Sequence, residues 1–174
     1  MKYIIAGGPS CGKTSLVKEL GRRGHKTVDE AAREVIKEGR LIPGTSEFQV
    51  EIFKRQVQRE DACYESAFFD RSALEGITYS KLFMGRVPRE LAEFDFRGRY
   101  TWIFILERLP FVDDGERVER DDAEAERVHN AIAMNYLEHG YSPLFVPLFP
   151  GKIEESLARR ADYVLNLIGG KDAH

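Results

Sequence analysis

A run of residues near the start of the chain has the pattern of a phosphate-binding loop. Its fixed positions, Gly7, Gly12, Lys13 and Thr14, fit G-x-x-x-x-G-K-[ST] throughout. Glycines let the backbone approach phosphate oxygens closely, the lysine reaches the β- and γ-phosphates, and the threonine hydroxyl binds Mg²⁺. We therefore predict that a nucleoside triphosphate binds to Gly7, Gly8, Pro9, Ser10, Cys11, Gly12, Lys13, Thr14 and Ser15.

Acidic residues further along the chain have the chemistry that such a site needs beside its lysine. Asp70 follows the apolar residues 67–69, and a carboxylate there is suited to hold Mg²⁺ or to polarise the attacking group. Capping of the following helix is the alternative role for Asp70. Glu30 is a candidate general base, and Asp29 competes with it for that role. For either residue, a carboxylate at a helix N-terminus is the alternative.

Three arginines are candidates for binding phosphate. Arg71 adjoins Asp70 and could bind a phosphate or a substrate hydroxyl, with an exposed ion pair as the alternative. Arg117 and Arg120 are spaced i,i+3 in the strongly charged stretch at about 110–122. Long charged loops at such a position often close as lids, so both arginines could stabilise a transferring phosphoryl group. A solvated loop whose arginines pair with neighbouring acids is the alternative.

The residues around the phosphate-binding pattern match the elements that it requires. Residues 2–6 form a short apolar run that predicts a strand, and residues 15–20 have apolar side chains at helical spacing. Strand, glycine loop and helix is the order found in phosphate-binding loops. An ordinary glycine turn with a surface lysine is the alternative, and the flanking elements disfavour it.

The rest of the chain alternates between predicted strands and helices, which favours an α/β fold with a parallel sheet covered on both faces. The continuous apolar run at 100–106 is typical of a strand buried on both faces, and Pro147 assigns the last strand to an edge. The remaining strands are expected at 25–28, 67–69 and 144–148. Helices are expected at 31–37, from 45 or 46 onward, and at 73–84, 88–95, 123–139 and 153–168.

Composition bounds the class of protein. With 174 residues, 43% hydrophobic and 32% charged, the chain is expected to form a single soluble domain over residues 1–174. No secretory signal or membrane-spanning run is read, so a cytoplasmic location is expected. A net charge of −3 does not indicate the basic surface that is typical of nucleic-acid-binding proteins. The two cysteines cannot make a zinc site alone, and the four histidines are expected at the surface or at helix ends.

These motifs, taken in order, resemble the small AAA-like ATP-binding domain family of P-loop NTPases. That family is similar to ribosylnicotinamide kinase and, more distantly, to deoxynucleoside and thymidylate kinases. The resemblance covers essentially the whole chain, although the chain has no room for the additional helical domain of AAA machines. The segments that carry it are the phosphate-binding loop and residues 29–33, 48–56, 68–72, 114–117 and 146–157.

The resemblance implies a three-layer P-loop kinase fold with a five-stranded sheet in the order 2-3-1-4-5. It also implies that Glu30 handles the acceptor hydroxyl and that residues 70–72 act as the Asp/Glu-Arg-Ser motif of nucleoside kinases. Arg117 and Arg120 would be lid arginines.

The sequence therefore predicts an ATP- and Mg²⁺-dependent kinase acting on a small nucleoside-like metabolite that the sequence does not identify. GTP stays open as the donor, although no Asn/Thr-Lys-x-Asp tetrapeptide for guanine occurs. An NTP-hydrolysing switch acting on a protein or membrane partner is the alternative. A nucleic-acid ATPase is disfavoured because the chain has no long basic helix or aromatic-rich strip. The oligomeric state is left open, a homo-oligomer included.

Overall fold

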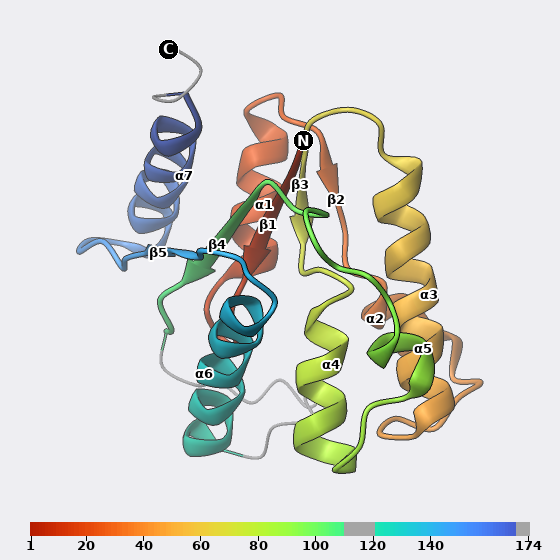
Figure 1. Ribbon diagram of the computed structural model, residues 1–174. Coiled ribbons are helices and arrows are strands. Elements are labelled where there is room, and N and C mark those ends of the chain that lie inside the picture. The colour runs from red at the N-terminus through yellow and green to blue at the C-terminus, as the bar shows by residue number, and fades with distance from the viewer. Residues whose placement is uncertain (110–120, 170–174) are drawn as a thin grey trace.

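Five strands form one parallel sheet in the computed structural model, which describes residues 1–109 and 121–169 (Figure 1). Their order across the sheet is β2-β3-β1-β4-β5. The predicted fold class and strand order are confirmed. The strands are β1 (Lys2–Ala6), β2 (Thr27–Val28), β3 (Ala67–Asp70), β4 (Trp102–Leu106) and β5 (Leu144–Val146).

Side chains of β1 alternate between the two faces of the sheet, as the period of a strand requires. Ile4 and Ala6 belong to one buried apolar cluster, and Tyr3 and Ile5 belong to another. Both faces of the sheet are therefore covered. β5 lies at the edge and ends just before Pro147, which agrees with the edge position predicted from that proline.

The face that carries Tyr3 and Ile5 packs against α1 (Lys13–Arg22) and α7 (Ile153–Gly169). Leu16 and Leu20 of α1 lie one turn apart and are fully buried in this layer, as is Val164 of α7. The apolar spacing that predicted these two helices is thus the spacing that buries them.

The opposite face packs against α3 (Ser46–Ala62), α4 (Glu75–Tyr79), α5 (Arg89–Ala92) and α6 (Asp122–Glu138). The helix predicted at 73–84 begins later, because the backbone first makes i,i+3 turns, with the N–H of Glu75 donating to the carbonyl of Ser72. From Ser80 to Met84 it becomes a π-helix, η1, which ends at Gly85 with φ +66°. The helix predicted at 88–95 is a single turn that starts after Pro88.

A buried ion pair ties α3 to the segment after β3. Glu60 is fully buried, and its Oε2 lies 2.6 Å from Nε of Arg99. The backbone N–H of Ala73 donates to Oε1 of Glu60 over 2.8 Å, and the Tyr100 hydroxyl donates to its Oε2 over 3.2 Å. Both oxygens of this carboxylate are therefore satisfied, which fixes the chain where it leaves the sheet.

The carboxyl ends of β1, β2 and β3 meet at one edge of the sheet. Asp70, the last residue of β3, lies opposite Ile5, two residues before the glycine loop begins. Val28 pairs with Phe69, so Asp29 and Glu30 leave the sheet beside the same edge. Within the two described ranges, no helix combines the length and the apolar character needed to cross a bilayer.

Candidate active site

The loop between β1 and α1 has a backbone that requires its glycines. Gly7 and Gly12 have φ angles of +127° and +83°, in the region that side chains rarely adopt, and Ser10 also has a positive φ of +58°. A Cβ at Gly8 would lie 2.8 Å from Cβ of His129, so that position needs a glycine for space. Gly12 is the N-cap of α1, and the free N–H groups of its first turn suit an anion.

Lys13 is folded back over this loop. Its side chain is buried, and its Nζ donates to the carbonyl oxygen of Gly8 over 2.6 Å and lies 3.6 Å from Sγ of Cys11. Cys11 itself is fully buried in the layer beneath the loop. The ammonium group is therefore held by a neutral carbonyl inside the loop, where a phosphate oxygen could replace that carbonyl as its partner.

Thr14 and Asp70 are joined across the two neighbouring strand ends. The Thr14 hydroxyl donates to Oδ2 of Asp70 over 2.6 Å. Oδ1 of Asp70 is buried and makes no hydrogen bond within the described part of the chain. Burial and the nearby charge of Glu30 raise the pKa of Asp70, against the lowering effect of Lys13. The helix-capping alternative does not apply, because α4 starts after Leu74, which makes no side-chain cap.

This donor set fits Mg²⁺. A buried carboxylate oxygen without a partner carries a desolvation cost that a cation or its bound water would remove. Mg²⁺ prefers oxygen ligands and takes one or two from the protein while it keeps waters and substrate phosphates. The Thr14 hydroxyl and Asp70 are therefore the residues that would hold this ion.

Glu30 lies between two arginines. Its Oε1 accepts from Nε of Arg33 over 2.7 Å, and its Oε2 lies 2.7 Å from Nε of Arg71. Burial alone would raise the pKa of this carboxyl, but the positive charges of Arg71, Lys13 and Arg33 hold it below its ordinary value. Glu30 is therefore an ionised acceptor, not a proton donor, at neutral pH. Asp29, its competitor for the role of base, is exposed.

Arg71 is not the exposed ion pair of the alternative interpretation. Its backbone has φ +70°, and its Nη1 donates to the Tyr79 hydroxyl over 2.8 Å. The same nitrogen lies 3.6 Å from Oε2 of Glu75, and the guanidinium covers the ring face of Tyr79. The side chain is thus fixed from α4 on one side and by Glu30 on the other.

Gln56 in α3 ends the segment 48–56 that carries the family resemblance, and its buried amide connects two of these strand ends. Its Oε1 accepts from the N–H of Ala31 over 3.2 Å, and its Nε2 donates to the carbonyl of Arg71 over 3.4 Å. Gln56 therefore sets the spacing between the segments that carry Glu30 and Arg71. The sequence placed Gln56 in the resembling segment and on the otherwise apolar side of a helix, and neither signal identifies its role.

Arg160 of α7 was also not predicted from the sequence as a residue of the site. It is buried and donates to the carbonyl oxygens of Cys11, Glu107 and Pro147 over 2.8, 2.7 and 3.0 Å. It thereby ties the glycine loop to the ends of β4 and β5. The three carbonyl partners come from distant parts of the chain, so no local pattern reveals this contact.

His129 corrects the expectation that the histidines lie at the surface or at helix ends. It sits in the middle of α6, and its Nδ1 accepts from the N–H of Gly8 over 3.1 Å. Burial and the charges of Arg108 and Lys13 lower the pKa of His129 to about 4. The ring is therefore neutral at neutral pH, as an acceptor must be.

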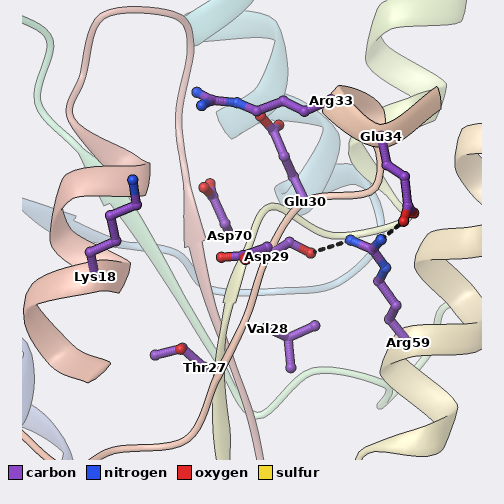
Figure 2. A pocket seen from close by; sticks show the side chains of 9 residues that line it. All are labelled: Lys18, Thr27, Val28, Asp29, Glu30, Arg33, Glu34, Arg59 and Asp70. Atoms are coloured by element: carbon purple, nitrogen blue, oxygen red, sulfur yellow. Dashed lines mark hydrogen bonds and ion pairs between the residues drawn. The ribbon is translucent and has the colours of Figure 1, made fainter. Parts of the chain in front are cut away.

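A cavity of about 530 Å³ opens beside Glu30 and Asp70 (Figure 2). Figure 2 shows the two carboxylates near its centre, with Lys18 of α1 on one side and Arg59 of α3 on the other. Arg71 is not among the residues that line it. The volume is that of a small-molecule site. Its walls are formed by Lys18, Thr27, Val28, Asp29, Glu30, Arg33, Glu34, Arg59 and Asp70.

The structure thus brings together the predicted glycine loop, Glu30, Asp70 and Arg71, with Arg33 beside Glu30. The predicted lid, with Arg117 and Arg120, lies outside the described residues apart from its last positions. The roles assigned to the site residues stay predictions.

A model of the family described as AAA domain matches residues 2–156. The solved structures that resemble the chain include the NadR protein in complex with NR, with a TM-score of 0.70 and 19% identity over 94% of this chain. This chain spans only 50% of that protein's length. No curated protein matches the sequence.

Two other similar structures are kinases. One is deoxyadenosine kinase from M. mycoides with the products dCMP and dCDP bound, at a TM-score of 0.63 and 14% identity over 98% of this chain and 100% of that chain. The other is shikimate kinase from Acinetobacter baumannii in complex with shikimate, at a TM-score of 0.54 and 14% identity over 99% of this chain and 95% of that chain. At such identities the likeness shows the fold.

Proposed function

Because this chain belongs to the AAA domain family of P-loop proteins, we propose that it is an ATP- and Mg²⁺-dependent kinase. It transfers the γ-phosphate to a hydroxyl group of a small, nucleoside-like metabolite. The family assignment confirms the resemblance that the sequence motifs indicated. The named kinases among the similar structures agree with the predicted enzyme class, a P-loop kinase or nucleoside triphosphatase.

The observation that carries this proposal is the cavity beside Glu30 and Asp70. One of its lining carboxylates, Asp70, bonds the Thr14 hydroxyl of the phosphate-binding loop. Glu30, another carboxylate that lines it, is held by Arg33 and Arg71 and is ionised. A site for hydrolysis alone needs room for a water, whereas 530 Å³ accommodates a metabolite.

The residues divide into a donor half and an acceptor half. Lys13 and the first N–H groups of α1 bind the triphosphate, and Lys13 exchanges the Gly8 carbonyl for a phosphate oxygen. Thr14 and Asp70 hold Mg²⁺, which when bound neutralises charge on the phosphates.

Glu30 accepts a hydrogen bond from the acceptor hydroxyl and orients it. Its lowered pKa makes it a weak base, which suffices because the transferred phosphoryl group passes through a loose transition state with little need for early proton removal. Arg33 bridges the two halves, since its Nη2 also lies 3.4 Å from the Thr14 hydroxyl.

Labelled ATP, Mg²⁺ and a panel of nucleosides, nucleotides and small hydroxy acids test the proposal directly. We expect label to appear in one acceptor class, and we expect Lys13→Ala to abolish it. Lys26→Ala, a change to an exposed lysine before β2, serves as the matched control and should retain transfer. If wild-type protein only hydrolyses ATP with every acceptor, the switch interpretation replaces the kinase.

A further inference from the structure

Two carboxylates share the guanidinium of Arg71. Oε2 of Glu30 lies 2.7 Å from its Nε on the cavity side, and Oε2 of Glu75 lies 3.6 Å from its Nη1 on the core side. Glu75 does not line the cavity. Glu75 therefore lies near Arg71 on the side away from the cavity, and Arg71 in turn pairs with Glu30, which the proposed reaction uses.

Glu75 is held in place, although only one of its two carboxylate oxygens accepts a hydrogen bond within the described residues. The residue is 2% exposed, and its Oε1 accepts from the Tyr136 hydroxyl of α6 over 3.0 Å. That hydroxyl also lies 2.7 Å from Oγ of Ser72. Oε2 of Glu75 makes no hydrogen bond within the described part of the chain. A carboxylate buried only for stability would be expected to have both oxygens satisfied.

The inference rests on the proposed kinase function. We propose that Glu75 is a positioning residue for phosphoryl transfer, which holds Arg71 between itself and Glu30 and so limits how tightly Arg71 binds Glu30. With Glu75 ionised, the positive charge of Arg71 is divided between two anions. With Glu75 neutral, Glu30 is the stronger anionic partner, and its oxygens are less available to an acceptor hydroxyl.

The charge of Glu75 changes in the neutral range. Burial raises its pKa to about 7, although Arg71, Lys13 and the Tyr136 hydroxyl favour the ionised form. The charge of Asp70 also faces it and acts in the opposite direction. Above pH 7 Glu75 is ionised and competes for Arg71, and below pH 7 it is neutral and does not.

Glu75→Gln tests the inference, since it keeps the shape of the side chain and an oxygen for Tyr136. With an acceptor found by the labelled-ATP panel, the wild-type transfer rate should rise as the pH increases through about 7. The variant should lack that inflection and should be about tenfold slower at pH 8, as for a misplaced catalytic group. ATP affinity should stay at the wild-type value.

Tyr136→Phe provides a second, independent variant. Losing the hydroxyl removes a donor that favours ionised Glu75, so the inflection should move to higher pH without disappearing. If Glu75→Gln keeps the wild-type inflection, or loses ATP affinity and transfer equally, the inference is wrong.

An experiment without acceptor separates this inference from the kinase proposal. The ¹⁵N–¹H resonance of Arg71 Nε should shift with a midpoint near pH 7 in wild-type protein and not in Glu75→Gln. If the resonance behaves so while no acceptor is phosphorylated, the kinase proposal fails and the link from Glu75 to Arg71 stands. If it does not titrate near neutral pH in wild-type protein, the link itself is refuted.

Discussion

Two buried clusters of arginine and glutamate lie on either side of the turn that follows β3. In the first, Glu60 accepts from Arg99, Tyr100 and the N–H of Ala73, so both of its oxygens are satisfied. In the second, Arg71 is shared by Glu30 and Glu75, and one oxygen of Glu75 has no hydrogen bond within the described residues.

This difference indicates that the cluster around Glu60 supports the fold, whereas the cluster around Arg71 belongs to the candidate site. The saturated cluster around Glu60, in which both carboxylate oxygens have partners, ties α3 to the segment that follows β3. Its contacts are expected to stay the same during a reaction. The unsaturated cluster around Arg71 lies between the core and the cavity, where charge must be available to a ligand. Incomplete satisfaction costs stability, and such costs are typical of functional positions.

The largest effect is expected when the saturated cluster is broken. Arg99→Met leaves Glu60 buried without its cation, which should lower the free energy of unfolding by about 3 kcal/mol. Urea denaturation measures this change. ATP affinity of the folded variant should be unaffected, and a loss of less than 1 kcal/mol would mean that the cluster is not the scaffold described.

A substitution in the unsaturated cluster should raise the free energy of unfolding at pH 8 instead of lowering it. The pKa of Glu75 is raised in the fold, so the native state binds a proton that the unfolded state releases, and wild-type stability falls as the pH rises from about 4.5 to about 7. Glu75→Gln should therefore match wild type near pH 5 and exceed it by roughly 2 kcal/mol at pH 8. Denaturation at both pH values checks this, and a variant that is less stable at pH 8 contradicts it.

Asp70→Asn changes the carboxylate that we propose as a Mg²⁺ ligand. The amide oxygen can still accept from Thr14, so the fold should persist, but the negative charge that favours Mg²⁺ is lost. The concentration of Mg²⁺ needed for half-maximal ATP turnover should rise about tenfold. An unchanged requirement would exclude Asp70 from the metal site.

The smallest effect is expected at His129, outside both clusters. His129→Leu removes the acceptor of the Gly8 N–H and should cost about 1 kcal/mol at pH 7.5. Because the pKa of His129 is lowered to about 4, this stabilisation is present above pH 6.5 and is lost as the pH falls toward 4. The difference in the free energy of unfolding between wild type and His129→Leu should shrink over that range, and a constant difference would contradict this.

The sequence predicted the parts of this molecule that depend on local pattern. The phosphate-binding loop requires glycines at fixed spacing. The apolar patterns of residues 2–6, of the helix from 45 or 46 onward and of residues 153–168 predict the elements that the structure has there. Asp70 and Glu30 could be identified because each lies at or just beyond the end of a strand, and the ends of parallel strands meet at one edge.

What the sequence did not predict depends on contacts between distant segments. Glu75 has the appearance of an ordinary charge in the first turn of a helix, and its pKa is raised by burial in the fold, against the lowering effect of Arg71 and the Tyr136 hydroxyl. Likewise, Gln56, His129 and Arg160 each bond backbone groups far away in the chain. The late start of α4 and its π-helical end follow from turns and packing that periodicity does not encode.

In the proposed function, the donor and acceptor halves of a phosphotransfer site meet at this sheet edge. The most direct test compares Lys13→Ala with Glu30→Gln, by titrating Mg²⁺–ATP calorimetrically and measuring transfer of label to the acceptor. We predict that Lys13→Ala loses both binding and transfer, and that Glu30→Gln keeps ATP affinity while transfer falls at least ~100-fold. Equal losses of ATP affinity in the two variants would contradict the claim.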